Sequence, residues 1–367
     1  MTNRLAELPG LLVLIPAAIG MRGNIFGALG SRLGTGIHAG LFDVSWRRRD
    51  FLPQNVYAST VLTLATSLFL AFVARGASAA FGLRSISVWG FMVISILGGV
   101  LGSIVVGTAT VLISVASHSR EWDLDSVSAP LVTAIGDTCT LPALWAVSYV
   151  VGIRYVTVTV AAIAAAVCLV WLIRGLLTDL PLARRVIRES LVVLFFAGTV
   201  DILAGTAIEA KTTRFFAFPA LLVLLPAFLE DTGALGGILS ARLSSKLHLG
   251  VIEPRRFPQP LAWLDASLNF LFAFSVFSLV ALSAQVISMA TGKASPGVLD
   301  MVSVSMFAGF LATIISSAIA YYGAVATFRF GWDPDNFGIP LVTSLMDLAG
   351  TLCLILGIVL FVGRIHG

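Results

Sequence analysis

Two aspartates occupy the same place in two copies of one short motif. Asp137 and Asp347 each lie four residues after the threonine of a Pro-Leu-Val-Thr segment, which is Thr133 in the first copy and Thr343 in the second. Residues four apart lie on one side of a helix, so each motif presents a hydroxyl and a carboxylate together. Hard cations take oxygen ligands, and Mg²⁺ keeps several of its waters while one or two carboxylates hold it. The motif therefore predicts a site for a partly hydrated divalent cation.

Both aspartates fall inside apolar stretches that are long enough to cross a membrane. An ionised Asp near the centre of a membrane helix costs about 2.5 to 3.5 kcal/mol on insertion scales. Bonding of the carboxylate to neighbouring hydroxyls is one explanation for its presence, and a bound cation is the other. Two carboxylates that meet would repel each other unless a cation lay between them. We therefore expect Asp137 and Asp347 to face each other across a central path for the ion.

Glycines recur at helical spacing in residues 20–30 and again in the matching part of the second copy. Such glycines allow helix backbones to approach closely, and we expect them to form the opposite wall of the site, although close packing alone explains them equally well. Asn24 adds a carbonyl oxygen in the first copy, whereas the second copy has Ala234 there and carries Glu230 and Asp231 a turn earlier. We interpret Asn24 and the acidic pair as further cation ligands, the pair serving ion access or coupling.

The chain matches itself at a shift of 210 residues. Residues 9–40 align without a gap over 219–250, and residues 122–137 align without a gap over 332–347. Apolar composition alone can align Leu with Leu, but it cannot place Trp, Asp, Pro, Thr and Asp in register twice. The matches predict an internal duplication.

Two basic residues close the first match in each copy. Arg32 falls on Arg242, and His38 falls on His248. We interpret all four as helix-end anchors, whose side chains extend toward water or bond the last carbonyls of the helix.

Composition places the chain in a membrane. Apolar residues make up 58% of its 367 residues and charged residues 11%, whereas a soluble domain has roughly 25% charged residues. The net charge is +4, but the basic residues lie at helix ends and in short loops, where they orient membrane helices. Nucleic-acid binding is therefore not expected. The three cysteines stand alone, which argues against a zinc site or a disulfide framework.

Ten apolar runs are long enough to span a bilayer. They cover residues 9–31, 54–74, 88–116, 129–151, 155–176, 186–208, 219–240, 261–290, 298–327 and 339–362. Their continuity favours helices over a barrel of short alternating strands. We therefore predict an all-α integral membrane protein with about ten transmembrane helices, which crosses the cell membrane many times.

The repeat divides these helices between two copies. We place the first repeat at residues 1–153, a linker helix at 154–180 and the second repeat at 181–367. Six spans separate the starts of the two copies, so both copies share one orientation and a pseudo-two-fold axis along the membrane normal relates them. The run at 186–208 has no counterpart, because counting back 210 residues passes the first residue.

At these residues the sequence resembles the membrane domain of the MgtE-type magnesium transporters. It is most similar to the arrangement of solute carrier family 41, in which two such domains share one chain. The resemblance covers nearly the whole chain, and it rests on residues 16–33, on residues 226–243 and on the two Pro-Leu-Val-Thr…Asp segments. It implies transport of Mg²⁺, held in hydrated form by Asp137 and Asp347. It also implies that the duplicated chain acts as a monomeric pseudo-dimer, with Mg²⁺ as substrate and no cofactor.

Other functions stay open on the sequence alone. An exchanger that couples a divalent cation to Na⁺ or H⁺ would use the same ligands. An intramembrane aspartyl protease also needs two buried aspartates, but on dissimilar helices, whereas these two stand in twin repeats. A structural scaffold would lose nothing when either aspartate is neutralised. We expect no enzyme, and we expect a divalent cation and the lipid bilayer as partners.

Overall fold

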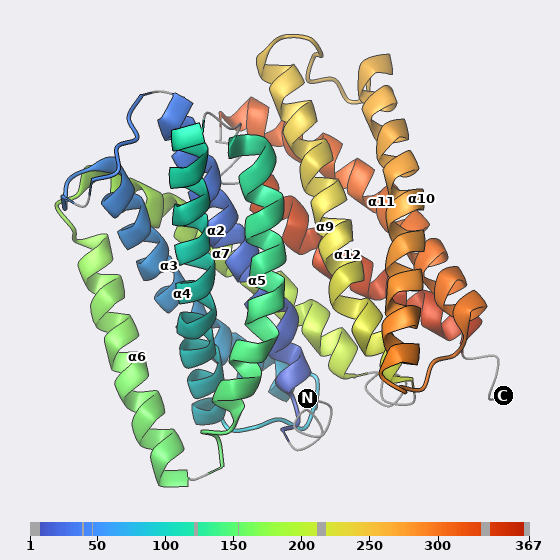
Figure 1. Ribbon diagram of the computed structural model, residues 1–367, viewed down its shortest axis with the longest axis horizontal. Helices are drawn as coiled ribbons and strands as arrows, with labels where there is room; N and C mark the ends of the chain where they lie inside the picture. The colour runs from blue at the N-terminus through green and yellow to red at the C-terminus, as the bar shows by residue number, and fades with distance from the viewer. Residues whose placement is uncertain are drawn as a thin grey trace. The chain divides into compact units, whose positions relative to one another are not determined.

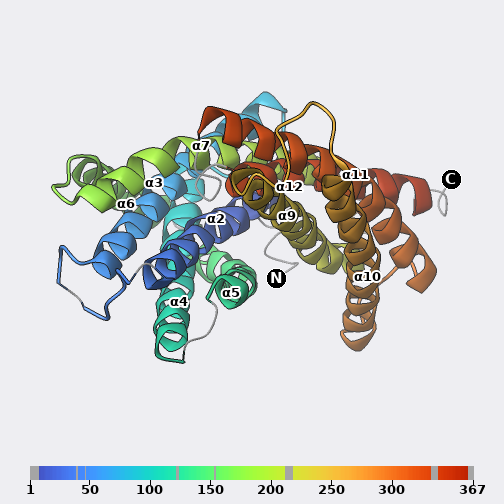
Figure 2. The ribbon, with the colours of Figure 1, turned by 90° about the horizontal axis from the view of Figure 1, so that it is seen from above.

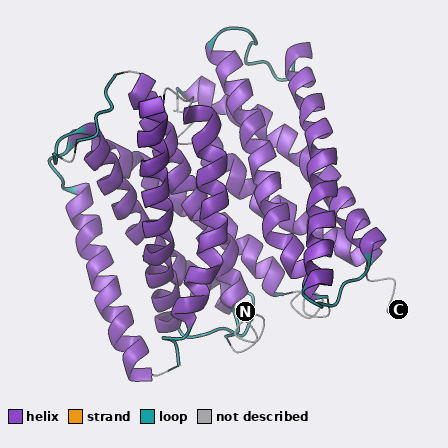
Figure 3. Ribbon diagram, in the orientation of Figure 1, coloured by secondary structure: helices purple, strands orange, loops and turns teal. Residues whose placement is uncertain are grey.

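The computed structural model describes residues 8–38, 40–45, 47–120, 124–152, 154–210, 218–331 and 338–362. Within these ranges the ordered elements are helices, and no strand occurs (Figure 3). The ten α-helices of these ranges are α2 (Leu11–His38), α3 (Phe51–Ala80), α4 (Val88–Arg120), α5 (Leu124–Ser148), α6 (Arg154–Leu176), α7 (Pro181–Glu209), α9 (Pro219–His248), α10 (Pro260–Ala290), α11 (Val298–Phe330) and α12 (Ile339–Phe361). Each contains one of the predicted apolar runs, in whole or in large part.

Nine of these ten helices are long and apolar enough to cross a membrane. The tenth helix, α5, includes side chains that lie outside the described residues, and it carries most of the predicted apolar run at 129–151. Many large apolar side chains on α6 and α10 are exposed, such as Ile163 and Phe274. Exposed apolar faces of this kind suit helices surrounded by hydrocarbon. The predicted all-α, multi-pass membrane fold is confirmed.

The chain forms two compact units, Met1–Gly205 and Thr206–Gly367. In the first unit α2 packs on α3, α4 and α5, α3 packs on α4, and α4 packs on α5. In the second unit α9, α10, α11 and α12 take the same four places and make the same five pairings. Figure 1 shows each set of helices within its own unit. The duplication predicted from the sequence is therefore present in the tertiary structure.

Equivalent helices also end in the same way. Gly82 after α3 and Gly292 after α10 both have a φ of 65°, a left-handed conformation that glycine adopts without a steric cost. The following residue then bonds back to the helix in both units, through Leu83 N–H to Ser78 O at 2.8 Å and Lys293 N–H to Ser288 O at 2.9 Å. The repeat therefore extends beyond the segments that match without a gap.

The first unit contains two further helices, α6 and most of α7. Helix α6 packs on α3 and α4 and lies at the edge of the unit beside α3 in both views (Figures 1 and 2). Helix α7 packs closely on α2, because a Cβ added to Gly205 would lie 2.2 Å from the carbonyl oxygen of Val13. Phe195 of α7 also stacks on Phe69 of α3, with ring centroids 4.1 Å apart.

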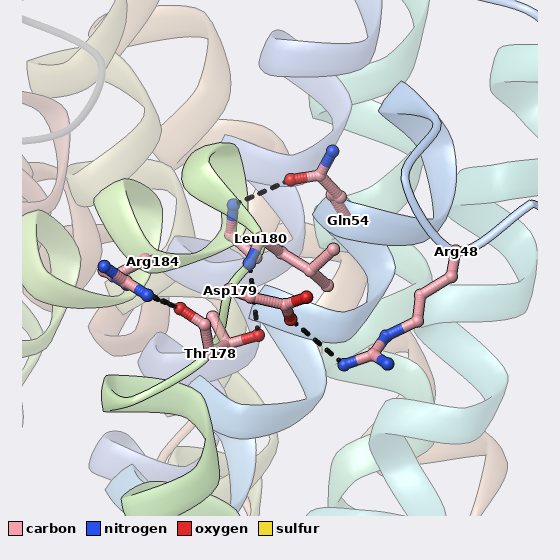
Figure 4. Close-up of polar contacts among 7 residues, drawn as sticks. Arg48, Gln54, Thr178, Asp179, Leu180 and Arg184 are labelled. Carbon is pink, nitrogen blue, oxygen red and sulfur yellow. Dashed lines mark hydrogen bonds and ion pairs between the residues drawn. The ribbon is translucent and has the colours of Figure 1, made fainter.

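Polar contacts tie the connection between α6 and α7 to α3 (Figure 4). The Oε1 atom of Gln54 accepts a hydrogen bond from the N–H of Leu182 at 3.2 Å, in the first turn of α7. Arg48 pairs with Asp179 at 3.2 Å, and the Arg184 guanidinium donates to the Thr178 carbonyl at 2.6 Å. A side chain of α3 thus satisfies one of the backbone donors that the start of α7 leaves open.

Candidate cation site

Helix α5 carries the first of the two predicted motifs. Asp137 lies in the middle of this helix and is half-buried. The preceding Gly136 faces α2, because a Cβ there would lie 3.9 Å from the Cβ of Arg22. The backbone of Thr133 lies in the same helix, one turn before Asp137, but its side chain falls outside the described residues, as do the Trp-Asp pairs at 122–123 and 332–333.

Helix α12 carries the second motif, with both of its polar residues half-buried. Thr343 bonds the carbonyl oxygen of Pro340 at 3.1 Å, and Asp347 lies one turn further along the helix. The glycine-rich helix α9 covers this region, since a Cβ on Gly233 would lie 3.8 Å from the Cβ of Thr343. A Cβ on Gly236 would lie 3.1 Å from Val342. These glycines therefore pack closely on α12 in the second unit, and their role as a wall of the ion site stays a prediction.

The acidic pair of α9 lies within one turn of Gly233. Glu230 and Asp231 are both half-buried. Glu230 precedes Gly233 by three residues, so the two lie on one face of α9. Gly236 meets the start of α12 and Thr232 meets Gly350, which shows that the helices run in opposite directions. Glu230 and Asp347 consequently lie at the same level of the second unit.

The first unit has fewer acidic groups at the equivalent level. Asn24 is half-buried in the middle of α2, and Gly20 stands at the position of Glu230. No group of three or more His, Cys, Asp or Glu side chains that could hold a metal occurs in the described part of the chain.

The matched arginines contact the next helix of their own repeat. Arg32 donates from Nε to Oδ1 of Asn55 at 2.9 Å. Asp265 is the equivalent of Asn55, and its carboxylate pairs with Arg242 at 3.1 Å and with Lys246 at 2.5 Å. Interpreting the arginines as helix-end anchors missed these contacts, because the acceptors lie more than 20 residues away in the chain.

The matched histidines behave partly as expected. The Nδ1 atom of His248 lies 2.8 Å from the Ser244 carbonyl oxygen, in the last turn of α9. A bond to a late carbonyl is the arrangement predicted for a helix-end anchor. The side chain of His38 lies outside the described residues.

Arg22 is a buried charge in α2 for which the sequence predicted no role. Its side chain is 4% exposed, and it is the one charged residue between Leu11 and Ser31. A lone arginine in an apolar run is a signal for a functional or structural role. The repeat hides this signal, because the equivalent residue is Thr232.

Comparison with known proteins assigns the family. The profile of the MgtE family, described as a divalent cation transporter, matches residues 15–147 and again residues 225–357. The chain belongs to this family. The second match begins and ends 210 residues after the first, in agreement with the duplication. The matched ranges contain every predicted ligand, namely Asn24, Thr133, Asp137, Glu230, Asp231, Thr343 and Asp347.

The relatives of this MgtE-family chain are members of solute carrier family 41. Member 3 of Rattus norvegicus is 24% identical over 370 residues, covering 95% of this chain and 79% of the relative. Member 2 of Mus musculus is 26% identical over 373 residues, covering 94% of this chain and 63% of the relative. Member 2 of Homo sapiens is 26% identical with the same coverage. The chain thus spans less than two thirds of the member 2 proteins. No solved structure matches it.

Family membership decides one of the open alternatives. The MgtE family consists of transporters, so the expectation that the chain is not an enzyme is confirmed and the aspartyl protease is set aside. The resemblance to MgtE-type proteins in the two-domain arrangement of solute carrier family 41 is confirmed as well.

Proposed function

We propose that this protein moves divalent cations, with Mg²⁺ as the main substrate, along a path between its two repeats. Asp137 and Asp347 hold the partly hydrated ion, with Thr133, Thr343 and Asn24 as additional oxygen ligands. The observation that carries the proposal is the repetition of one Thr–Asp face in two units with the same internal packing. Membership in a family of divalent cation transporters supports it.

The chemistry of the ligands favours Mg²⁺. Each unit offers one carboxylate on α5 or α12, and Mg²⁺ needs only one or two carboxylates when it keeps several waters. Close helix packing at glycines such as Gly233 gives a narrow wall without side chains that would displace those waters. We propose that a single chain, with its two repeats, suffices as a pseudo-dimer.

A coupled exchanger is the second candidate. Glu230 and Asp231 add two acidic groups to the second repeat that the first repeat lacks. Such extra carboxylates suit a second ion, Na⁺ or H⁺, whose binding alternates with that of the divalent cation. Uptake that depends on an imposed Na⁺ or pH gradient would favour this mechanism over simple conduction.

Mg²⁺ uptake into proteoliposomes tests the proposal. Asp137→Asn and Asp347→Asn should each reduce uptake by tenfold or more, because each removes one of two charges that face the ion. Asp179→Asn is the matched control, since Asp179 is 61% exposed in the loop before α7 and should transport like wild type. Wild-type uptake in both Asp137→Asn and Asp347→Asn would refute the site.

A further inference from the structure

The Arg22 guanidinium lies in the interior of the first unit without a carboxylate partner among the described residues. It donates from Nη2 to the carbonyl oxygen of Gly98 at 2.9 Å and from Nη1 to that of Ala18. Its Nε has no hydrogen-bond partner in the part of the chain that the structure describes. Neutral carbonyls do not cancel a full charge, so the side chain brings a net positive charge into the unit.

Helices α4 and α5 shape the space around this side chain. A Cβ added to Gly102 of α4 would lie 2.5 Å from Nε of Arg22, so the guanidinium rests on bare backbone. On the other side, the Cβ of Arg22 faces Gly136 of α5, which directly precedes Asp137. The charge is therefore built into the same helix contact that carries the predicted cation ligand of the first repeat.

The second unit has uncharged residues at the equivalent positions. Phe277 replaces Ser67 and Thr232 replaces Arg22. The register is the same, because Ser95 bonds the Ser67 carbonyl at 2.7 Å and Ser305 bonds the Phe277 carbonyl at 2.8 Å.

The ring of Phe277 occupies the space opposite Gly309, since a Cβ there would lie 2.2 Å from its Cδ2. It also contacts the ring of Phe228, with centroids 5.0 Å apart. The sister unit thus builds the same packing without a charge, so the arginine is not required to make this arrangement of helices.

The equivalent turns of α2 and α9 carry opposite charge. Residues 20–22 are Gly-Met-Arg, with a formal charge of +1, and residues 230–232 are Glu-Asp-Thr, with a formal charge of −2. We infer that Arg22 is a specificity-determining residue, a fixed positive charge that weakens divalent-cation binding at Asp137 relative to Asp347. The ion that both aspartates hold then lies nearer to Asp347 than to Asp137, so the first repeat releases it readily. This inference rests on the proposed function.

Coulomb's law gives the size of the effect. A unit charge about 10 Å from a doubly charged ion changes its binding about fourfold if the surroundings screen like water, and more than a hundredfold at the effective dielectric constant of about 20 found for protein sites. Weak binding at one position also helps conduction, because an ion must leave the protein as well as enter it.

Equilibrium binding of Mg²⁺ to the purified full chain, measured by calorimetry, tests the inference. In an Asp347→Asn background, where Asp137 is the remaining motif aspartate, Arg22→Gln should tighten Mg²⁺ binding at least about fourfold, and Arg22→Lys should leave it unchanged. In an Asp137→Asn background the ion shifts toward Asp347 and away from Arg22, so Arg22→Gln should have a much smaller effect. Equal effects in the two backgrounds, or none in either, would overturn the inference.

A second variant separates charge from packing. Arg22→Thr combined with Ser67→Phe copies the residues of the second unit, so it removes the charge while refilling the space. It should tighten Mg²⁺ binding as Arg22→Gln does, with a melting temperature near that of wild type. Tightening by Arg22→Gln but not by this pair would assign the effect to packing and refute the role of charge. Failure of the proposed function can be distinguished from failure of this inference. If the proposed function is wrong, Asp137→Asn and Asp347→Asn will both transport like wild type.

Discussion

The ion pairs around Asp265 tie α10 to α9 in the second unit, and the first unit shows what replaces them. Asp265 is 3% exposed, and it bonds Arg242 at 3.1 Å and Lys246 at 2.5 Å. In the first unit the same place holds Asn55, whose Oδ1 accepts from Arg32, and Gly36 stands at the position of Lys246. Asp265→Asn should therefore destabilise the second unit, because Arg242 and Lys246 both lose the carboxylate that they share.

The magnitude follows from the exposure of the partners. Removing one member of a buried pair costs about 3 to 5 kcal/mol. The Arg242 side chain is 45% exposed and that of Lys246 is 25% exposed, so water compensates for part of the loss and about 1 to 3 kcal/mol remains. For a unit of this size that corresponds to a melting temperature lower by roughly 2 to 12 °C.

Thermal unfolding in detergent, monitored by size-exclusion chromatography, measures this change in melting temperature. Adding Lys246→Ala to Asp265→Asn copies the single pair of the first unit and should restore about 1 kcal/mol, so the double variant is more stable than the sum of the single effects predicts. Asp179→Asn, in an exposed loop, is the control. A wild-type melting temperature for Asp265→Asn, or strict additivity in the double variant, would refute the reasoning.

Two further predictions concern the attachment of α7 to the first unit. Gly205→Ala should lower the melting temperature by several degrees, because the new Cβ would lie 2.2 Å from the backbone oxygen of Val13. The control Gly27→Ala should leave the melting temperature equal or raise it, because a Cβ there has nothing within 4 Å. Equal effects of the two variants would contradict the close packing of α7 on α2. Gln54→Ala should lower the free energy of unfolding by about 1 kcal/mol and speed proteolysis between α6 and α7, because Leu182 N–H loses its acceptor. The control Gln54→Glu should keep this hydrogen bond. Identical cleavage rates for both variants would argue against this cap.

Much of the architecture could be predicted from the order of residues. The run at 88–116 lies inside α4, Val88–Arg120, and the run at 298–327 lies inside its partner α11, Val298–Phe330. A membrane helix must be predominantly apolar over about 20 residues, so local composition suffices to find it. The duplication was also readable, since repeated polar residues in register survive in the sequence even where apolar residues do not discriminate.

The candidate site could be predicted only as a set of residue types on helix faces. The spacing of Thr343 and Asp347 placed both on one side of α12, and the close packing of α9 at its glycines followed from its composition. The meeting of Asp137 with Asp347 stays a prediction, to be decided by the transport measurements.

The sequence by itself determined which segments cross the membrane, that the chain is built twice, and which family it belongs to. Only the tertiary structure decided that Arg22 rests on the glycines of α4, and that Phe277 fills the space opposite Gly309 in the sister unit. The same holds for the two bases that share Asp265. The physical reason is that a helix pattern depends on neighbours within a few residues, whereas a buried charge depends on side chains that approach from other helices.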